Sequence, residues 1–238
     1  MPISRLLLVT IGVLVVLSAA CSAPAPTFEE EFSGVTGVVL NSGDGSVSIV
    51  GTSRDNVIVS AEASFSDTEQ FDVRVEDGLL VIEHDCGEAS SCTVDYQVTV
   101  PETTGVEVTT AGGNVSVSDV KAGVGVTTET GDIFVRRVEG DIVASTTSGL
   151  MTGTQNRSRV ASFTSQESEI SVSFDEVIDT LRAETGEGDV TAQLTGGPYA
   201  LEVETGSGSV DVNIDVVDDA DNRAAIRTGK GDIKIFQN

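Results

Sequence analysis

The chain has 238 residues, with 13 Lys and Arg against 38 Asp and Glu, which gives a formal net charge of −25. A surface of this charge repels the phosphates of nucleic acids, so we expect no nucleic-acid partner. Trp is absent and aromatic residues make up only 4% of the chain, a composition that favours β-strands joined by glycine turns over helices. Cations, basic peptides and neutral glycans remain as partners, although the charge also serves to keep an exported protein soluble.

The amino terminus has the pattern of a secretory signal peptide. Arg5 precedes an apolar run over residues 6–17, and small residues at 18–20 precede Cys21. The run is shorter than the roughly 20 apolar residues that a transmembrane helix needs. We therefore expect residues 1–20 to be a signal peptide that is removed on export.

Residues 17–21, Leu-Ser-Ala-Ala-Cys, resemble a bacterial lipoprotein lipobox. The match departs from the family pattern at Ser18, where Leu is usual. The resemblance implies that Cys21 carries acyl chains, such as palmitate, and becomes the anchored amino terminus, with residues 21–31 as a flexible tether. An ordinary signal-peptidase cut after Ala20 is the alternative.

Residues 32–101 contain several short β-rich runs separated by turn residues. Asp77-Gly78 is a good two-residue hairpin turn. We expect this region to cap the repeats that follow, because an end coil of a solenoid otherwise exposes unpaired backbone. His84, the only histidine, is expected at a strand end, on the surface and without a catalytic role.

Cys86 and Cys92 are the two cysteines that remain once Cys21 is assigned to the lipid anchor. An exported chain meets an oxidising compartment, so we expect a disulfide that closes the loop between them. A zinc site would need further Cys or His ligands, and a redox dithiol more often has two intervening residues.

A motif of Thr, a Gly turn and then Val or Ile alternating with polar residues recurs between residues 106 and 236. The apolar residues that follow the turn recur at steps of 18 to 23 residues, at Val115, Ile133, Met151, Ile170, Val190, Val210 and Ile233. A Thr or Ser stands five residues before each of them, and these hydroxyls are expected beside the turns, exposed or hydrogen-bonded along the ladder. A second apolar column precedes the hydroxyl column, at Val106, Val124, Ile142, Val160, Leu181, Leu201 and Ile226.

Each copy offers two short strands with period-2 alternation, and no copy can bury its apolar face alone, so the copies must stack. We predict an all-β, parallel β-solenoid (β-helix-like) of about seven 18–20-residue coils over residues 102–238, in a single domain of residues 32–238. An antiparallel sandwich of hairpins is the competing architecture. The fourth copy, residues 165–174, lacks the glycines and predicts a local bulge. The last strand, residues 233–236, is expected to be an open edge.

The run Val-Thr-Val-Pro at residues 98–101, followed by units such as Thr-Gly-Asp-Ile at 130–133, resembles a family of bacterial envelope proteins with β-strand repeats. Members of that family carry the name putative adhesin or domain of unknown function. The resemblance covers roughly residues 28–238 and implies a β-solenoid on the outer side of the cytoplasmic membrane. Its motif is specific for architecture, and the family has no agreed activity.

Four acidic residues stand directly before the aligned apolar position: Asp132, Glu169, Asp189 and Asp232. The three aspartates are weak candidates for a calcium site. Other residue types interrupt this column, and aspartate is also favoured in turns for its own hydrogen bonding. Turn formation is therefore the preferred interpretation, and we expect no metal.

Residue types suited to catalysis are sparse. The repeats contain one basic cluster, Arg136-Arg137, with Lys121 one repeat earlier, and nothing resembles a nucleophile–base pair, a P-loop or a His-rich metal site. We therefore expect no enzyme and no cofactor.

The sequence predicts an exported lipoprotein held at the cell membrane or outer membrane by its lipid, facing the periplasm or the exterior. Its repeat domain would act as a non-catalytic binding or structural module at the cell envelope, with an envelope glycan, a protein or a cationic peptide as partner. One alternative is an envelope-stress sensor or regulator that binds cationic peptides. Another is a glycan-active β-helix enzyme.

Overall fold

The structure is a computed structural model that describes residues 27–64, 71–84 and 93–238. The described residues form 21 strands and no helix, so none of their segments crosses a membrane as a helix. The all-β prediction is confirmed. The signal peptide, Cys21, Cys86 and Cys92 lie outside the described residues, and the predictions for them stay predictions.

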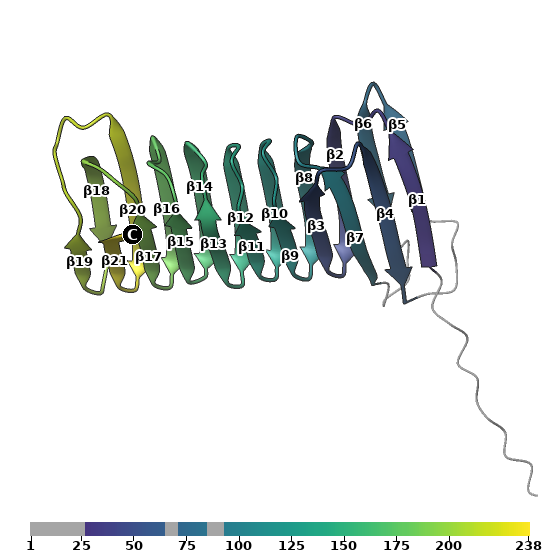
Figure 1. The fold of residues 1–238 in the computed structure, drawn as a ribbon. Helices are drawn as coiled ribbons and strands as arrows, with labels where there is room; N and C mark the ends of the chain where they lie inside the picture. The colour runs from purple at the N-terminus through teal and green to yellow at the C-terminus, as the bar shows by residue number, and fades with distance from the viewer. Residues whose placement is uncertain (1–26, 65–70, 85–92) are drawn as a thin grey trace, which may run out of the picture.

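Two sheets face each other along one axis (Figure 1). Sheet 1 holds, in spatial order, β1 (Thr27–Ser33), β4 (Asn56–Ala63), β7 (Val94–Pro101), β3 (Val47–Thr52), β9 (Val115–Ser118), β11 (Ile133–Arg136), β13 (Met151–Asn156), β15 (Ile170–Phe174), β17 (Val190–Leu194), β21 (Ile233–Gln237) and β19 (Val210–Asn213). Sheet 2 holds β5 (Phe71–Glu76), β6 (Leu79–His84), β2 (Gly37–Asp44), β8 (Gly105–Gly112), β10 (Val124–Thr130), β12 (Ile142–Ser148), β14 (Val160–Glu167), β16 (Thr180–Glu187), β20 (Asn222–Lys230) and β18 (Tyr199–Thr205).

Each predicted repeat contributes one strand to each sheet, and neighbouring repeats pair in parallel. The parallel solenoid is therefore confirmed and the antiparallel sandwich is wrong for the repeats. The first apolar column is in register, as in the pairs of Ile133 with Val115 and with Met151. The second column is corrected at two positions. Ala161 and not Val160 is the partner of Ile142, and Ala224 and not Ile226 is the partner of Leu181.

The last repeat in the chain is not the last in space. Strands β20 and β21 lie between the coil β16–β17 and the coil β18–β19, as the left end of Figure 1 shows. Strand β21 pairs with β17 on one side and with β19 on the other. The expectation of an open edge at residues 233–236 is therefore wrong, and the edges are β18 and β19.

The amino-terminal end has a comparable exchange of order. The coil β6–β7 stacks on the outer side of the coil β2–β3, although it comes later in the chain. On its other side, the coil β2–β3 pairs in parallel with β8–β9. Antiparallel strands then close this end, with β4 on β7, β1 on β4 and β5 on β6. Strand β1 begins at Thr27, so residues 27–31, expected in the tether, form a strand instead.

The core consists of the inward-facing residues of both sheets, mostly Val, Ile and Ala, in one continuous cluster. The hydroxyl column lies inside this core at the glycine turns, where Thr110, Thr128 and Thr228 are at most 3% exposed. Its members hydrogen-bond locally, as Thr110 Oγ1 does to Thr128 Oγ1 at 3.0 Å. Of the two placements expected for these hydroxyls, exposed or hydrogen-bonded along the ladder, the structure shows the second.

Two further expectations from the sequence concern the fourth repeat and His84. The bulge expected at the fourth repeat occurs on the neighbouring strand, where the register of β13 against β15 shifts between Gly153 and Asn156. His84 ends β6, as predicted, but it is buried at 9% exposure and not on the surface. Alternation along β6 turns this position inward, with Leu80 and Ile82.

Candidate functional site

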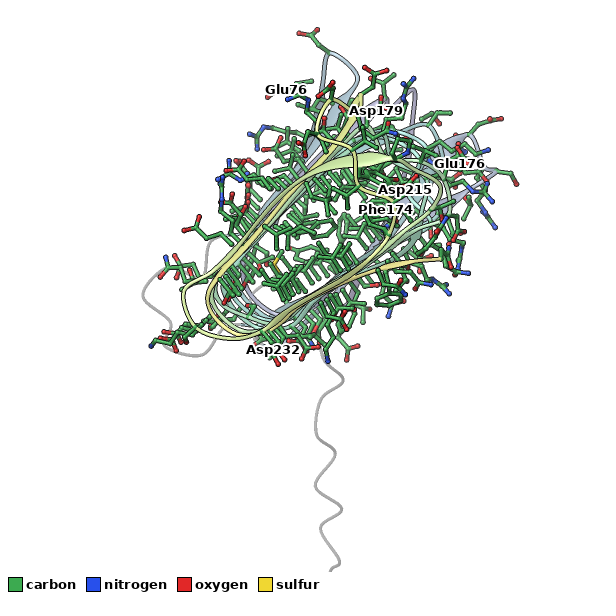
Figure 2. The ribbon with its side chains drawn as sticks, turned by 90° about the vertical axis from the view of Figure 1, so that its left-hand side faces the viewer. Glu76, Phe174, Glu176, Asp179, Asp215 and Asp232 are labelled. Atoms are coloured by element: carbon green, nitrogen blue, oxygen red, sulfur yellow. The ribbon has the colours of Figure 1, made fainter. Side chains whose placement is uncertain are left out.

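The glycine-turn side of the solenoid, marked by Asp232 in Figure 2, is occupied by structural hydrogen bonds. The Asp132 carboxylate accepts the backbone N–H of Leu150 at 2.8 Å, and the Asp189 carboxylate accepts that of Asp232 at 2.8 Å. Asp232 in turn accepts the N–H of Ser209 at 2.7 Å, which lowers the pKa of its carboxyl. Within the described ranges, no group of three or more His, Cys, Asp or Glu is placed to hold a metal. The aspartate column therefore joins one coil to the next.

The opposite side consists of the corner loops where the chain leaves a sheet 1 strand and crosses to sheet 2. Charged side chains gather there, around Glu176 and Asp179 in Figure 2, on the side away from Asp232. The loops follow β7, β9, β11, β13 and β15, so successive coils place equivalent loop residues side by side. This stacking makes the corner a continuous surface.

Three stacked corner residues adopt a left-handed backbone conformation. Asp119, Arg137 and Gln155 have φ of 63°, 53° and 56°, and each follows the previous one by one coil. Such a φ is uncommon for a residue other than glycine and costs on the order of 1 kcal/mol, with Asp among the more tolerant types. The strained backbone turns all three side chains onto the same face of the corner.

Asp119 and Arg137 form a two-pronged ion pair across neighbouring coils. Arg137 Nε lies 2.6 Å from Asp119 Oδ1, and Arg137 Nη2 lies 2.6 Å from Asp119 Oδ2. These bonds lower the pKa of the Asp119 carboxyl and raise the pKa of the Arg137 guanidinium. The planar fork fixes the orientation of both groups, a property that single-point lysine pairs lack.

A second row of charges runs beside this pair and alternates in sign from coil to coil. Its members are Glu102, Lys121, Glu139, Arg157 and Glu176. Lys121 Nζ lies 2.6 Å from Glu102 Oε2, whereas Arg157 stands 4.0 Å from Glu139 and 3.9 Å from Glu176. The guanidinium of Arg157 is thus held loosely between two carboxylates and is 53% exposed. Exposed pairs of this kind contribute about 0–1 kcal/mol each to stability, so the row is a weak stabiliser.

The two rows enclose a groove of about 250 Å³. Its lining residues are Glu102, Asp119, Lys121, Arg137, Glu139, Gln155, Arg157 and Asp175. Four are acids and three are bases, so the groove is almost neutral on a chain whose net charge is −25. It offers donors and acceptors together, which suits hydroxyl-rich ligands that hydrogen-bond in both senses.

The sequence identified part of this site and missed its construction. Of the basic cluster Arg136-Arg137 and the preceding Lys121, which the sequence indicates, Arg137 and Lys121 line the groove and Arg136 does not. The sequence pattern did not indicate their acidic neighbours. The signal that could have revealed the groove is the coil spacing itself, because Asp119 and Arg137 are 18 residues apart and therefore stack. The weak metal candidates Asp132, Asp189 and Asp232 lie on the other side of the solenoid, and the groove does not include them.

Solved structures with a similar trace come from bacterial proteins of low identity. They include "a putative cell adhesion protein from Clostridium sporogenes ATCC 15579", 14% identical, covering 90% of this chain and 100% of that one with a TM-score of 0.37. A "putative adhesin (BF0245) from Bacteroides fragilis NCTC 9343" is 12% identical, with coverage of 88% and 97% and a TM-score of 0.44. A "putative lipid binding protein from Parabacteroides distasonis ATCC 8503" is 10% identical, with coverage of 90% and 98% and a TM-score of 0.34.

At these TM-scores the structural neighbours carry no argument about function. No curated protein is similar enough to this sequence to count as a match. A family model does match, over residues 37–237, and its description is Toastrack DUF4097.

Proposed function

Because this chain belongs to the Toastrack DUF4097 family, a family defined by architecture, we propose its function from the site: a non-catalytic binding module of the cell envelope. The observation that carries this proposal is the groove of about 250 Å³ on the corner loops, with its paired acids and bases.

The ligand class that the groove fits best is a neutral, hydroxyl-rich glycan of the envelope. A guanidinium can donate hydrogen bonds to adjacent sugar hydroxyls, and the carboxylates beside it can accept hydrogen bonds from them. The near-neutral lining neither attracts nor repels an uncharged chain, while the acidic surface around it disfavours anionic polymers.

The binding test uses isothermal titration of the full chain with two neutral probes, a dextran oligosaccharide and an oligosaccharide of N-acetylglucosamine. We expect one of them to bind, and the double substitution Arg137→Gln with Arg157→Gln to weaken binding at least about tenfold, because hydrogen bonds from charged donors contribute about 1.5–3 kcal/mol each. The matched control is Arg182→Gln with Arg223→Gln, which removes the same charge outside the groove.

Equal losses in the two double variants would show that only bulk charge matters and would reject the groove. The same mixtures are assayed for released reducing ends. Release of sugar that depends on the groove residues would reject the non-catalytic binding module and support the glycan-active enzyme.

We also propose that the module is exported and held at the membrane through an acylated Cys21, as the lipobox resemblance implies. Strand β1 begins six residues after this cysteine, so the cap end of the solenoid lies next to the anchor. Mass spectrometry of the mature amino terminus is expected to show acyl chains on Cys21, and Cys21→Ser is expected to move the protein from the membrane fraction to the soluble fraction. An unmodified terminus at Cys21 would reject the anchor and leave the groove proposal untouched.

A further inference from the structure

The two ends of the solenoid are finished differently. Antiparallel strands β1, β4 and β5 close the amino-terminal end. At the other end, β18 and β19 have a strand neighbour on one side only, within the described part of the chain. Figure 2 looks onto this end, where side chains of the interior are visible between the two sheets.

The backbone of β18 faces outward at alternate residues. The N–H and C=O of Tyr199 bond to residues 215 and 217, at 3.1 and 3.0 Å, which lie on the outer side of β18. The N–H of Gly206 bonds instead to Thr228 of the inner neighbour β20 at 3.0 Å. Alternate residues of a parallel ladder point their backbone groups to opposite sides. The N–H and C=O groups on the open side are therefore those of Leu201, Val203 and Thr205.

Strand β19 repeats this arrangement in sheet 1. The N–H of Ile233 on the inner neighbour β21 bonds to the C=O of Ser209 at 2.9 Å, which sets the alternation. The backbone groups of Val210 and Val212 therefore point to the open side. Their side chains face the interior column but are 46% and 38% exposed, because no further coil covers them. Such an edge can template another strand.

The charges on the solvent-exposed face of β18 indicate which side chains a strand added at this edge should carry. Arg227 of β20 lies between two carboxylates, with Nη1 2.8 Å from Glu184 Oε1 on β16 and Nη2 bonded to Glu202 on β18. Glu204 lies 3.9 Å from the same guanidinium and is its direct partner in the register. The row across sheet 2 thus alternates in sign and ends on two exposed glutamates. A cation is the complementary next member.

We propose that this end binds an extended segment of a partner protein in which Lys or Arg alternates with Val, Ile or Leu. The segment adds a strand to β18, with its backbone bonded to Leu201 and Val203, its apolar side chains over the open interior and its cations beside Glu202 and Glu204. This is recognition by strand addition, in which backbone bonds supply affinity and alternate side chains supply specificity.

A second copy of the chain fits this edge less well than a basic segment. Two copies joined end to end would bring Glu202, Glu204 and Asp211 of each into proximity with the same acids of the other. The loop after β19 adds four more aspartates to the same end, at residues 215, 218, 219 and 221. Like charges across an interface disfavour association, so the charges select a basic partner.

The experiment measures binding of the full chain to a capped nine-residue peptide that alternates Lys and Val, and to its Glu–Val counterpart, in low salt and in 0.5 M salt. We expect the Lys peptide to bind and the Glu peptide not to bind, with weaker binding in high salt. The same Lys peptide N-methylated at both its Lys and its Val residues, which cannot donate backbone bonds to β18 in either strand direction, is expected to bind at least about tenfold more weakly.

Two variants locate the site on the protein. Val203→Pro removes an outward N–H that has no strand partner among the described residues, and an edge strand tolerates such a change. This variant is expected to weaken binding about tenfold. Glu202→Gln with Glu204→Gln is expected to weaken it to a similar extent. The matched control, Glu29→Gln with Glu30→Gln, removes the same charge from β1 at the other end and should change affinity by less than about twofold.

Three results would overturn the proposal: equal binding of the Lys and Glu peptides, unchanged affinity of the N-methylated peptide, or an equal loss in the control variant. A dimer in light scattering that dissociates on Val203→Pro would make a second copy the occupant instead. The groove variants Arg137→Gln and Arg157→Gln are expected to leave peptide affinity unchanged, so this proposal and the glycan proposal fail independently.

Discussion

Gly131→Ala is expected to destabilise the domain by about 3 kcal/mol or more. Gly131 has φ of 139°, a region that residues with a Cβ almost never adopt, and a Cβ placed there would lie 2.1 Å from the carbonyl oxygen of Gly113 in the preceding coil. Neither problem can be relieved locally, because the clash is with backbone. Chemical denaturation followed by circular dichroism measures the loss.

Gly125→Ala is the matched control, six residues earlier in the same repeat. A Cβ at Gly125 would lie 3.7 Å from Glu107 Cγ and 3.9 Å from the carbonyl oxygen of Val106, both ordinary van der Waals distances, and the backbone there is not left-handed. We expect this substitution to be neutral or to stabilise by up to about 1 kcal/mol, through a less flexible unfolded chain. Similar losses in both variants would mean that the turn geometry is not what requires glycine at position 131.

Phe163→Ala is expected to cost about 3–5 kcal/mol, the usual range for a fully buried aromatic ring. Phe163 is 0% exposed and occupies a column that holds Ala144 and Ala183 in the adjacent coils. Gly153 makes room for the ring, because a Cβ at that position would lie 2.9 Å from Phe163 Cζ. Phe236→Ala, which removes a phenyl ring that is 36% exposed, should cost less than about 1 kcal/mol.

Gly153 and Phe163 together supply a test of energetic coupling. Gly153→Ala alone should destabilise by about 1–3 kcal/mol through overpacking. In the Phe163→Ala background the space is vacant, so the same change should be neutral or stabilising, with a coupling energy of about 1 kcal/mol or more. Additive effects in this double-mutant cycle would show that the missing Cβ at Gly153 does not compensate for the ring.

Much of the repeat architecture was predictable from the sequence, because each column has one physical requirement. Glycine recurs where a Cβ would strike the neighbouring coil, and Val or Ile recurs where alternation turns the side chain inward. The prediction slipped by one residue at Val160 because neighbouring Ala161 is also apolar, and pattern alone does not choose between them. The sequence left open whether the threonine hydroxyls are exposed or hydrogen-bonded, because the pattern alone does not show that they bond to each other and to turn carbonyls inside the core.

The candidate site was less predictable. The groove depends on residues from five successive loops, and loops lack the periodic apolar signal that defines the strands. The open end was misplaced because repeats of near-identical pattern can exchange places in a stack without any change of sequence signal. Only the structure distinguishes the order β17, β21, β19 from the order of the chain.

The exchanged order of the last two coils has a consequence for how the protein is made. Strands β18 and β19 precede β20 and β21 in the chain and are therefore synthesised first. Their apolar columns also match the position beside β16 and β17 that the later coil occupies. The final repeat, β20–β21, therefore takes its place between the coils β16–β17 and β18–β19 and is not added at the free end of the stack. In a chain truncated before residue 222, β18 would have to pair with β16 to keep the stack continuous, a pairing that the last 17 residues replace in the full chain.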